Sequence, residues 1–373
     1  MEYDELYLSR AFELARLGRF TTSPNPNVGC VIVRNRCIVG EGYHQRVGEP
    51  HAEIYALRMA GKDARGATAY VTLEPCSHQG CTPPCSDELI SSGIARVVVA
   101  MPDPNPTVAG RGLYRLQKAG INVRHGLMLT EAEAINLGFF KRMRTGLPWV
   151  RLKLAASLDG RTAMSSGESQ WITSFQSRQD MQNFRAESDA ILSSASTILA
   201  DNPALTVRWS SLTEEIQNLY PKIQLRQPIR VIVDSNNRVT PQHRIIQEDG
   251  FTWLARLTPD TQIWPKSVEQ LIFPKKSSQA VKHLDLVMLM MKLGRRQINN
   301  VWVEAGATLA GALLTARLVD ELILYQAPKL LGENARPLCL LPSVSQLNDV
   351  LTFTLLNIRQ VGPDISLHLK PEK

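Results

Sequence analysis

Residues 69–76, with the sequence AYVTLEPC, decide the fold class of this 373-residue chain. The run begins as a short, largely apolar segment typical of a buried strand, and Glu-Pro-Cys ends it. Helical patterns flank it at 51–60 and 84–92, and each begins beside a proline and ends at a glycine. Strands that alternate with helices at this short spacing predict an α/β domain with a largely parallel sheet.

The same alternation continues on both sides of this segment. We expect helices at 8–15, 112–119 and 131–144, and strands at 31–33, 37–39, 95–100 and 121–124. The pattern stops at residues 145–148, TGLP, where Gly-x-Pro stands between a helix and a strand. This boundary predicts two domains, residues 1–146 and 147–373.

The second half is again α/β, and it shows no repeat of the first. The expected strands are 149–155, 190–192, 229–234, 252–255, 300–304, 321–326 and 365–369. The expected helices are 177–187, 281–292 and 308–317. The chain therefore reads as two unlike α/β domains.

Composition narrows the class of protein. Hydrophobic residues make up 44% of the chain and charged residues 21%, as in soluble globular proteins. The net formal charge of +7 is modest, and no run of five basic residues concentrates it. The densest basic patch, KRMR at 141–144, suits an acidic small molecule about as well as nucleic acid, and a solvated helix end is the simpler interpretation. We find neither a secretory signal nor an 18-residue apolar stretch, so we expect a cytoplasmic protein without a membrane segment.

Five of the six cysteines fall in the first quarter of the chain, which points to metal binding or catalysis. His51 begins one helix, Cys76 follows a strand, and Cys85 begins the next helix, where the helix dipole would stabilise its thiolate. Imidazole and thiolate are ligands that zinc prefers, and three of them leave a position open for water. Glu53, two residues after His51, fits the proton-shuttling glutamate of zinc deaminases.

The spacing departs from the generic zinc-deaminase signature, since eight residues rather than two separate Cys76 from Cys85. Cys81 lies between them and is a rival ligand. From the residues alone, a closed structural zinc with four protein ligands, in a binding module without catalysis, therefore remains an alternative. Cys30, Cys37 and Cys339 read as reduced thiols without a role in the site.

Several segments resemble the bifunctional deaminase–reductase family of bacterial riboflavin biosynthesis. They are PNPNVGCVIV at 24–33, GEGYH at 40–44, HAE at 51–53, TLEPCSH at 72–78 and TPPC at 82–85. The resemblance implies a cytidine-deaminase-like three-layer α/β/α domain, with His51, Cys76 and Cys85 as ligands of one zinc ion and Glu53 as the catalytic proton shuttle. It leaves Cys81 out of the metal site. It also implies substrate contacts from Asn25, His44, Ser77 and His78, although Asn25 could simply hold a turn and His44 could be a satisfied loop histidine.

The second half resembles the reductase domain of the same family, which has a dihydrofolate-reductase-like α/β fold. The matching segments are LKLAASLDGR at 152–161, SQWIT at 169–173, DNPALTVR at 201–208, VDS at 233–235 and EAG at 304–306. The NADPH contacts implied by the match are Ala155, Trp171, Thr197, Asp201, Ser235, Gly306, Ala307, Thr308, Leu309, Ala310, Gly311 and Ala312. The implied contacts to the substrate's ribose phosphate are Lys153, Ser169, Arg185, Leu205, Arg208 and Glu304. Two arginines suit a phosphate, because each guanidinium can bind it bidentately. Two of these residues also have an interpretation without a ligand: Trp171 could be a core aromatic, and Arg185 could be a solvated helix residue.

The family implies two successive reactions. A zinc-activated water replaces the amine of 2,5-diamino-6-ribosylamino-4(3H)-pyrimidinone 5′-phosphate, and NADPH then reduces the ribosyl group to ribityl. We expect this phosphorylated ribosylaminopyrimidine as the substrate, no nucleic acid or membrane partner, and a homo-oligomer, either dimer or tetramer. The alternative within enzymes is a nucleic-acid deaminase, for instance one acting on tRNA, which would need a basic face and leaves the second half unexplained.

Overall fold

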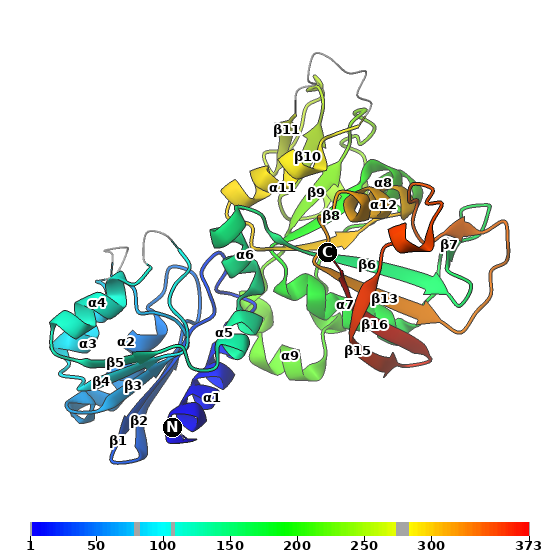
Figure 1. Cartoon of the computed structure of the whole chain (residues 1–373). Coiled ribbons are helices and arrows are strands. Elements are labelled where there is room, and N and C mark those ends of the chain that lie inside the picture. The colour runs from blue at the N-terminus through cyan, green and yellow to red at the C-terminus, as the bar shows by residue number, and fades with distance from the viewer. Residues whose placement is uncertain (1, 78–82, 106–108, 274–282, 373) are drawn as a thin grey trace. The chain divides into compact units, whose positions relative to one another are not determined.

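The computed structural model describes residues 2–77, 83–105, 109–273 and 283–372. The chain divides between Gly146 and Leu147 into two compact units, which Figure 1 shows with their elements labelled. Both units are α/β, as predicted. Among the described residues, no helix combines the length and the apolar character that crossing a bilayer requires.

The first unit is built on a five-stranded sheet in the order β2-β1-β3-β4-β5. Its elements are α1 (Glu2–Leu17), β1 (Gly29–Arg34), β2 (Cys37–Tyr43), α2 (Ala52–Ala60), β3 (Thr68–Val71), α3 (Cys85–Ser91), β4 (Arg96–Val99), α4 (Arg111–Lys118), β5 (Asn122–His125), α5 (Leu129–Ile135) and α6 (Leu137–Thr145). Strands β3, β4 and β5 are parallel, whereas β1 is antiparallel to both β2 and β3. The expectation of a largely parallel sheet is therefore wrong for half of its strand pairs, because the β1–β2 hairpin inserts an antiparallel strand beside β3.

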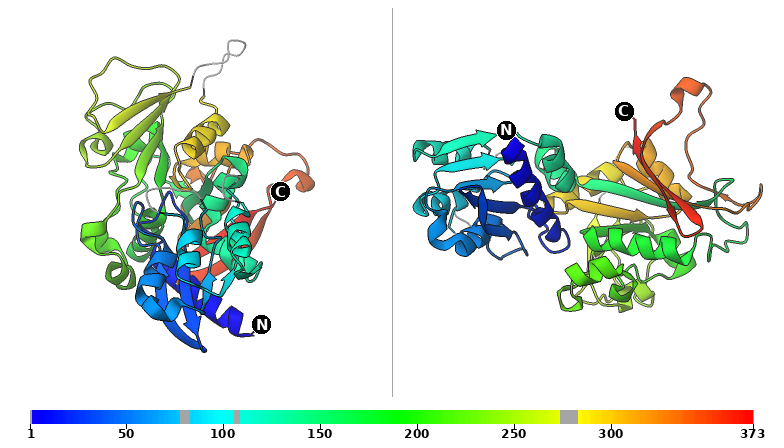
Figure 2. Two further views of the ribbon diagram at one scale, coloured as in Figure 1. Left: turned by 90° about the vertical axis from the view of Figure 1, so that its left-hand side faces the viewer. Right: turned by 90° about the horizontal axis from the view of Figure 1, so that it is seen from below.

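Alternating side chains of this sheet feed two hydrophobic layers. Val31 and Val98 face α1 and α5, and Ile32 and Val97 face α2, α3 and α4. Figure 2, seen from below, shows α1 lying along one face of the sheet. The unit is thus a three-layer α/β/α sandwich.

Helix α2, which carries the candidate site, lies unusually close to β2. A Cβ atom added at Gly42 would lie 2.4 Å from the carbonyl oxygen of Ala52, and one added at Gly40 would lie 2.2 Å from that of Ala56. Only glycine permits this approach of two backbones. The sequence Gly40-Glu41-Gly42 therefore fixes the depth of α2, and with it the position of His51 and Glu53.

The helix expected at 131–144 is broken into α5 and α6 at Asn136. The Asn136 side chain pairs with the backbone of Asn27, since its Oδ1 accepts from Asn27 N at 2.7 Å and its Nδ2 donates to Asn27 O at 2.8 Å. The backbone of Asn136 leaves the helical conformation, with φ at −133°, where α5 ends and α6 begins. Hydrophobic periodicity does not register such a contact.

The second unit is built on a nine-stranded sheet in the order β11-β10-β9-β8-β12-β6-β13-β16-β15. Its elements are β6 (Trp149–Ser157), β7 (Arg161–Ala163), α7 (Phe175–Glu187), β8 (Ala190–Ser194), α8 (Ala195–Asp201), α9 (Glu214–Leu219), β9 (Ile229–Val233), α10 (Arg244–Gln247), β10 (Thr252–Arg256), β11 (Val268–Ile272), α11 (Leu286–Arg295), β12 (Asn300–Glu304), α12 (Ala307–Thr315), β13 (Glu321–Ala327), β14 (Arg336–Pro337), β15 (Phe353–Val361) and β16 (Asp364–Pro371). The strands from β11 to β13 are parallel, and the β15–β16 hairpin joins β13 antiparallel at one end of the sheet (Figure 2).

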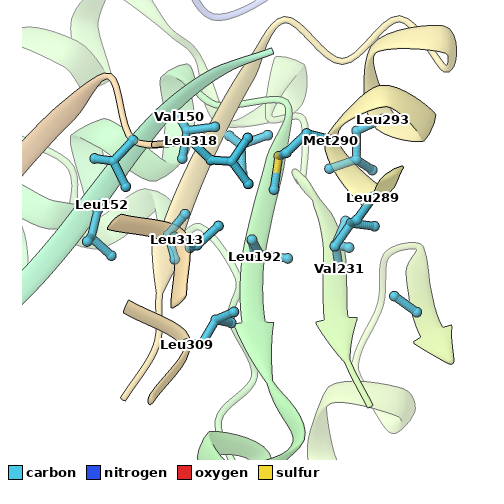
Figure 3. Close-up of a cluster of buried hydrophobic side chains, with 14 of the residues drawn as sticks. Val150, Leu152, Leu192, Val231, Leu289, Met290, Leu293, Leu309, Leu313 and Leu318 are labelled. Atoms are coloured by element: carbon cyan, nitrogen blue, oxygen red, sulfur yellow. The ribbon is translucent and has the colours of Figure 1, made fainter. Parts of the chain in front are cut away.

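One face of this sheet packs against α11 and α12. Figure 3 shows Leu192 of β8 and Val231 of β9 pointing into a cluster with Leu289 and Leu293 of α11 and Leu313 of α12. The opposite face packs against α7, α8 and α10 through a second cluster that includes Met181, Ile198 and Ile245. With both faces covered, the loops at the carboxyl ends of the parallel strands are left to carry ligands.

Candidate functional site

The first unit brings together the predicted zinc ligands. His51 is the N-cap residue of α2, Cys76 follows β3, and Cys85 is the first residue of α3. One ligand atom from each lies within 4.8 Å of the others, with His51 Nδ1 3.2 Å from Cys85 Sγ and 3.6 Å from Cys76 Sγ. Tetrahedral zinc with bonds of about 2.05 Å to nitrogen and about 2.3 Å to sulfur separates the two by about 3.6 Å. The donor types and their spacing therefore fit zinc.

The helix dipole acts on a different thiolate from the one expected. The backbone N–H of Cys85, at the start of α3, donates to Cys76 Sγ at 3.3 Å. Hydrogen bonds from Cys85 and from His51 lower the pKa of Cys76 to about 4, whereas the hydrogen bond with Cys76 and burial raise that of Cys85. The first N–H of α3 thus supports the Cys76 thiolate.

Glu53 lies beside this cluster on the first turn of α2. Its side chain is buried, with 3% exposed, and it interacts with the Cys85 thiol. Burial raises the pKa of Glu53 above its ordinary value. A buried carboxyl group whose pKa is raised toward neutrality is suited to take up and release a proton.

Two of the predicted substrate contacts bond each other. His44 is buried, its Nδ1 lies 3.1 Å from the carbonyl oxygen of Pro50, and its Nε2 lies 3.1 Å from Nδ2 of Asn25. Burial lowers the pKa of His44, which favours the neutral ring that donates from Nδ1 and accepts at Nε2. Both ring nitrogens thus have protein partners, as a satisfied loop histidine would. The His44 ring also meets the His51 ring edge-on, with centroids 5.3 Å apart.

Ser77 directly follows the ligand Cys76, and its carbonyl oxygen accepts a hydrogen bond from Arg115 at 3.2 Å. His78 and Cys81 lie outside the described residues, so the structure places neither of them.

Sequence reasoning missed Glu74, two residues before Cys76. Its buried carboxylate accepts four backbone N–H groups, with Oε2 bonded to Asp103 and Gly110 at 3.1 and 3.0 Å and Oε1 bonded to Gly112 and Leu113 at 2.9 and 3.3 Å. Glu74 thus anchors the start of α4 and the segment before it to the strand that leads to Cys76. No local pattern could have indicated this contact, because the four N–H groups lie 29 to 39 residues further along the chain.

In the second unit, the predicted NADPH contacts gather at the carboxyl ends of four adjacent strands. Thr197 follows β8, Ser235 follows β9, Gly306 follows β12, and Ala155 lies near the end of β6. This edge of an open parallel sheet is where nucleotides bind in α/β proteins. Asp201 is exposed at the end of α8 and Trp171 is 61% exposed, so the interpretation of Trp171 as a core aromatic is wrong.

The predicted NADPH contacts at 306–312 differ in how far their side chains are buried. Gly306, Thr308 and Ala312 are exposed, and Ala307 is half-buried. Leu309 and Ala310 belong to the hydrophobic core, and a Cβ atom at Gly311 would lie 1.8 Å from the carbonyl oxygen of Leu340. The side chains at 309–311 therefore face the protein interior, and the exposed start of α12 is the part of this run that is open to a ligand.

The predicted substrate contacts of this unit centre on Glu304. Arg185 of α7 donates from Nε and Nη2 to the two carboxylate oxygens at 2.6 and 2.8 Å, and from Nη1 to Thr206 O at 2.7 Å. Arg185 is 7% exposed, so the interpretation as a solvated helix residue is wrong. Its bidentate edge pairs with the Glu304 carboxylate in this structure.

Lys153 of β6 is the register partner of Glu304 of β12. Burial and the charges of Arg185 and Arg178 lower the pKa of Lys153, while Glu304 opposes this shift. Burial alone would raise the pKa of Glu304, but Arg185 and Lys153 lower it below its ordinary value. The pair thus places an ammonium group and a carboxylate side by side at this edge of the sheet.

Sequence reasoning also missed Arg178. Its guanidinium lies 4.2 Å from the centre of the Trp171 ring, and its charge lowers the pKa of Lys153 and contributes to lowering that of Arg208, for which burial is the main cause. Arg178 precedes Arg185 by seven residues, so both lie on one face of α7. That spacing was the signal that could have found it.

The remaining predicted substrate contacts differ in exposure. Arg208 is exposed, and its backbone N–H donates to Gln182 at 2.9 Å. Ser169 is half-buried, whereas Leu205 is 4% exposed and packs into the core with Ile198 and Ile232. The Leu205 side chain is therefore closed to a ligand, and a contact from this residue would have to come from its backbone.

Comparison with known proteins yields two family matches. Residues 1–101 match the cytidine and deoxycytidylate deaminase zinc-binding region. Residues 148–367 match the RibD C-terminal domain. The matches fall on the two units separately.

Curated relatives extend over the full length. The chain is 66% identical over 366 residues to the riboflavin biosynthesis protein RibD of Escherichia coli, covering 98% of this chain and 99% of the relative. It is 52% identical over 370 residues to the protein of the same name from Haemophilus influenzae, covering 99% and 98%.

Solved structures of the same family resemble the chain over its full length. The chain superposes on Acinetobacter baumannii RibD with a TM-score of 0.90 at 42% identity, covering 100% of this chain and 99% of the other. With a TM-score of 0.85 at 31% identity and the same coverage, it matches a Thermotoga maritima diaminohydroxyphosphoribosylaminopyrimidine deaminase/5-amino-6-(5-phosphoribosylamino)uracil reductase. The predicted fold class is confirmed: a cytidine-deaminase-like domain precedes a dihydrofolate-reductase-like domain.

Proposed function

Because the chain belongs to the RibD family of riboflavin-biosynthesis deaminase–reductases, we propose that the two side-chain clusters described above are its two active sites. The chain is a bifunctional enzyme that uses Zn²⁺ and NADPH, as the sequence predicted. The proposed deaminase domain is residues 1–146 and the proposed reductase domain is residues 147–373. The proposed substrate is the phosphorylated ribosylaminopyrimidine.

The main support for the deaminase site is that His51, Cys76 and Cys85 converge beside the buried Glu53. Zinc held by these three residues supplies Lewis-acid activation of a water molecule. Glu53 accepts the proton of the attacking water on its carboxylate and returns it to the departing amine, a transfer typically worth about 10²–10⁴ in rate. Asn25, His44, Ser77 and His78 are the proposed contacts to the pyrimidine and its ribose phosphate.

In the reductase site, we assign substrate binding to the basic cluster around Glu304. Arg208, which the sequence predicted, and Arg178, which it did not, face the phosphate. Lys153 and Glu304 lie beside the reacting sugar carbon and can hold a proton there. NADPH supplies the hydride, along the strand ends that carry Ala155, Thr197 and Ser235. Trp171, Asp201 and the start of α12 complete the proposed cofactor contacts.

The ligand set can be tested at Cys81, which a closed structural site would recruit as a fourth ligand. We expect Cys81→Ser to retain one zinc per chain, measured by atomic absorption after dialysis against a weak chelator. Loss of zinc from this variant would favour the closed site.

We propose a homo-oligomer, a dimer or a tetramer, of cytoplasmic location and without a nucleic-acid partner. Support for self-association comes from β15, an edge strand on which Leu355, Leu356 and Ile358 are 52%, 49% and 56% exposed. Exposed apolar edge strands are aggregation hazards unless they are covered. Light scattering of the purified chain measures its oligomeric state. A gel-shift titration with tRNA over a range of salt concentrations tests for nucleic-acid binding, which we expect to be negligible.

The function is tested by incubating the protein with the diaminopyrimidine ribosyl phosphate and NADPH while following ammonia and NADPH together. Ammonia release followed by NADPH loss supports both sites and their order. Ammonia without NADPH loss contradicts the second site, and neither signal from zinc-loaded protein contradicts the proposed substrate.

A further inference from the structure

Arg238 bridges two strand ends of the second unit. It is not among the residues assigned to either proposed site. Arg238 lies in the turn after β9, and its Nη2 donates to Oγ of Ser196, in the segment after β8, at 2.8 Å. Both side chains are exposed. Ser196 precedes Thr197, and Arg238 follows Ser235 by three residues in the same turn. Thr197 and Ser235 are proposed cofactor contacts, so Arg238 borders the same edge of the sheet.

The backbone that carries Arg238 is held in place. Asp234 accepts the N–H groups of Arg238 and Val239 at 2.8 and 3.1 Å. Arg256 in turn donates to Asp234 Oδ2 from Nη2 at 2.9 Å, and both of these side chains are fully buried. The turn is thus preorganised, and its one carboxylate is already occupied.

The guanidinium of Arg238 has no carboxylate within ion-pair distance among the residues that the structure describes. In dinucleotide sites, a carboxylate near the adenosine ribose favours the 2′-hydroxyl of NADH, whereas an arginine accommodates the 2′-phosphate of NADPH. Here Asp234 is withdrawn into the core and an uncompensated arginine points outward. This combination suits the 2′-phosphate.

Strand order separates the two ends of the cofactor. The proposed reacting centre, Lys153 and Glu304, lies on β6 and β12, and β9 is three strand spacings from β6. At about 4.8 Å for each spacing, this is roughly 14 Å across the sheet. Glu304 itself, on β12, is two spacings from β9, or roughly 10 Å. A dinucleotide whose nicotinamide lies at the Lys153–Glu304 pair and which extends past Thr197 and Ser235 would bring its adenosine over β8 and β9.

We propose that Arg238, with the Ser196 hydroxyl, binds the 2′-phosphate of NADPH and is the specificity-determining residue for NADPH over NADH. The proposal rests on the proposed cofactor site at Thr197 and Ser235. Arg238 binds the phosphate as a charge-assisted hydrogen-bond donor, and Ser196 can turn its own hydroxyl hydrogen toward a phosphate oxygen.

Calorimetric titration with NADP⁺, NAD⁺, 2′,5′-ADP and 5′-AMP tests this without turnover. We expect Arg238→Ala to weaken NADP⁺ and 2′,5′-ADP about 10- to 100-fold, as the loss of a charged hydrogen bond does, and to leave NAD⁺ and 5′-AMP within twofold. Arg238→Lys, which keeps the charge, should fall between wild type and Arg238→Ala. The matched control is Arg295→Ala, which removes an exposed arginine from the last turn of α11 and should change no affinity.

The outcomes separate the inference from its premise. If wild type binds NADP⁺ tightly and Arg238→Ala binds it equally well, the role of Arg238 is overturned while the cofactor site stands. If Arg238→Ala weakens NADP⁺ and NAD⁺ to the same extent, Arg238 does not read the 2′-phosphate. If wild type binds neither NADP⁺ nor 2′,5′-ADP, the proposed cofactor site itself fails.

Discussion

Arg185 and Glu304 form a two-point ion pair that ties helix α7 to the end of strand β12, with nitrogen–oxygen distances of 2.6 and 2.8 Å. The Trp302 indole N–H donates to the same carboxylate at 2.8 Å, and the Phe184 ring stacks on Trp302 at a centroid distance of 4.9 Å. The carboxylate of Glu304 is therefore held in one orientation beside Lys153, its register partner. In the proposed reductase site, Arg185 would therefore act through Glu304, as a positioning residue.

Replacing Arg185 should affect one activity only. In Arg185→Ala, Glu304 keeps its buried charge without its main partner, and breaking such a pair costs about 3–5 kcal/mol. This cost falls on folding stability. Because a misplaced group in a site can lower the rate about 10²-fold, we expect a loss of about 100-fold in kcat/KM for NADPH oxidation with deaminated substrate. Ammonia release should stay within twofold of wild type. Equal loss of both activities well below the melting temperature would show that Arg185 is not specific to the reductase site.

Replacing Glu53 should affect the other activity. Glu53→Gln keeps the shape of the buried side chain but removes its ability to accept a proton, so we expect deamination to fall by about 10²–10⁴. Zinc content should remain one per chain, and NADPH oxidation with deaminated substrate should be unchanged. The matched control is His51→Ala, which should lose zinc as well as deamination. If Glu53→Gln also loses its metal, Glu53 serves the zinc site structurally.

The zinc ligands could be predicted because each one stands in a short sequence segment whose secondary structure can be read from that segment alone. His51, Cys76 and Cys85 stand at the starts of helices or at the end of a strand, and side chains at such positions converge at one edge of a sheet. Their chemistry identifies the metal. The alternation of elements also sufficed for the α/β class, because each helix and strand shows its own periodicity.

The parts that could not be predicted depend on contacts between distant residues. The helix expected at 131–144 ends at Asn136, whose side chain bonds Asn27, 109 residues away. Leu205 matches a substrate-binding segment, yet its side chain enters the core. The pairing of Arg185 with Glu304 spans 119 residues, and no local pattern distinguishes an arginine that binds phosphate from one that holds a carboxylate.

Glu74 should stabilise the segment around the zinc site. Its two oxygens accept four backbone N–H groups, and Glu74→Gln turns one of these oxygens into a donor that faces N–H groups. We expect a loss of about 2–3 kcal/mol in the stability of the first unit, as for hydrogen bonds to a charged group. Zinc release during urea unfolding reports on this unit, while all six tryptophans lie between residues 149 and 302 and report on the second. The control Glu41→Gln, whose partner Arg10 is 43% exposed, should change stability by less than about 0.5 kcal/mol.

Asp4 should make the stability of the first unit depend on pH. Its carboxylate is 5% exposed and accepts hydrogen bonds from Arg96 at 2.9 and 2.8 Å, from Arg124 at 3.0 Å and from the Tyr70 hydroxyl at 3.0 Å. The hydrogen bonds from Arg96 are the largest of the effects that lower the pKa of Asp4. Because the pKa is lower in the folded than in the unfolded chain, where it is about 3.9, the stabilisation is complete above that value and is lost as the pH falls through the folded pKa.

The variant Asp4→Asn tests this pH dependence. At pH 7 we expect it to destabilise the first unit by about 1–2 kcal/mol, since Arg96 and Arg124 are partly exposed, and to lower its melting temperature by about 2–8 °C. The difference from wild type should shrink as the pH falls below 4, because protonated Asp4 then resembles asparagine. Calorimetric scans between pH 7 and pH 3 measure it, with tryptophan fluorescence identifying the transition of the second unit. Asp63→Asn, whose side chain is 64% exposed beside Arg34, should show no comparable difference at any pH. A deficit of Asp4→Asn that persists unchanged at pH 3 would mean that its charge contributes nothing and that only packing or geometry is lost.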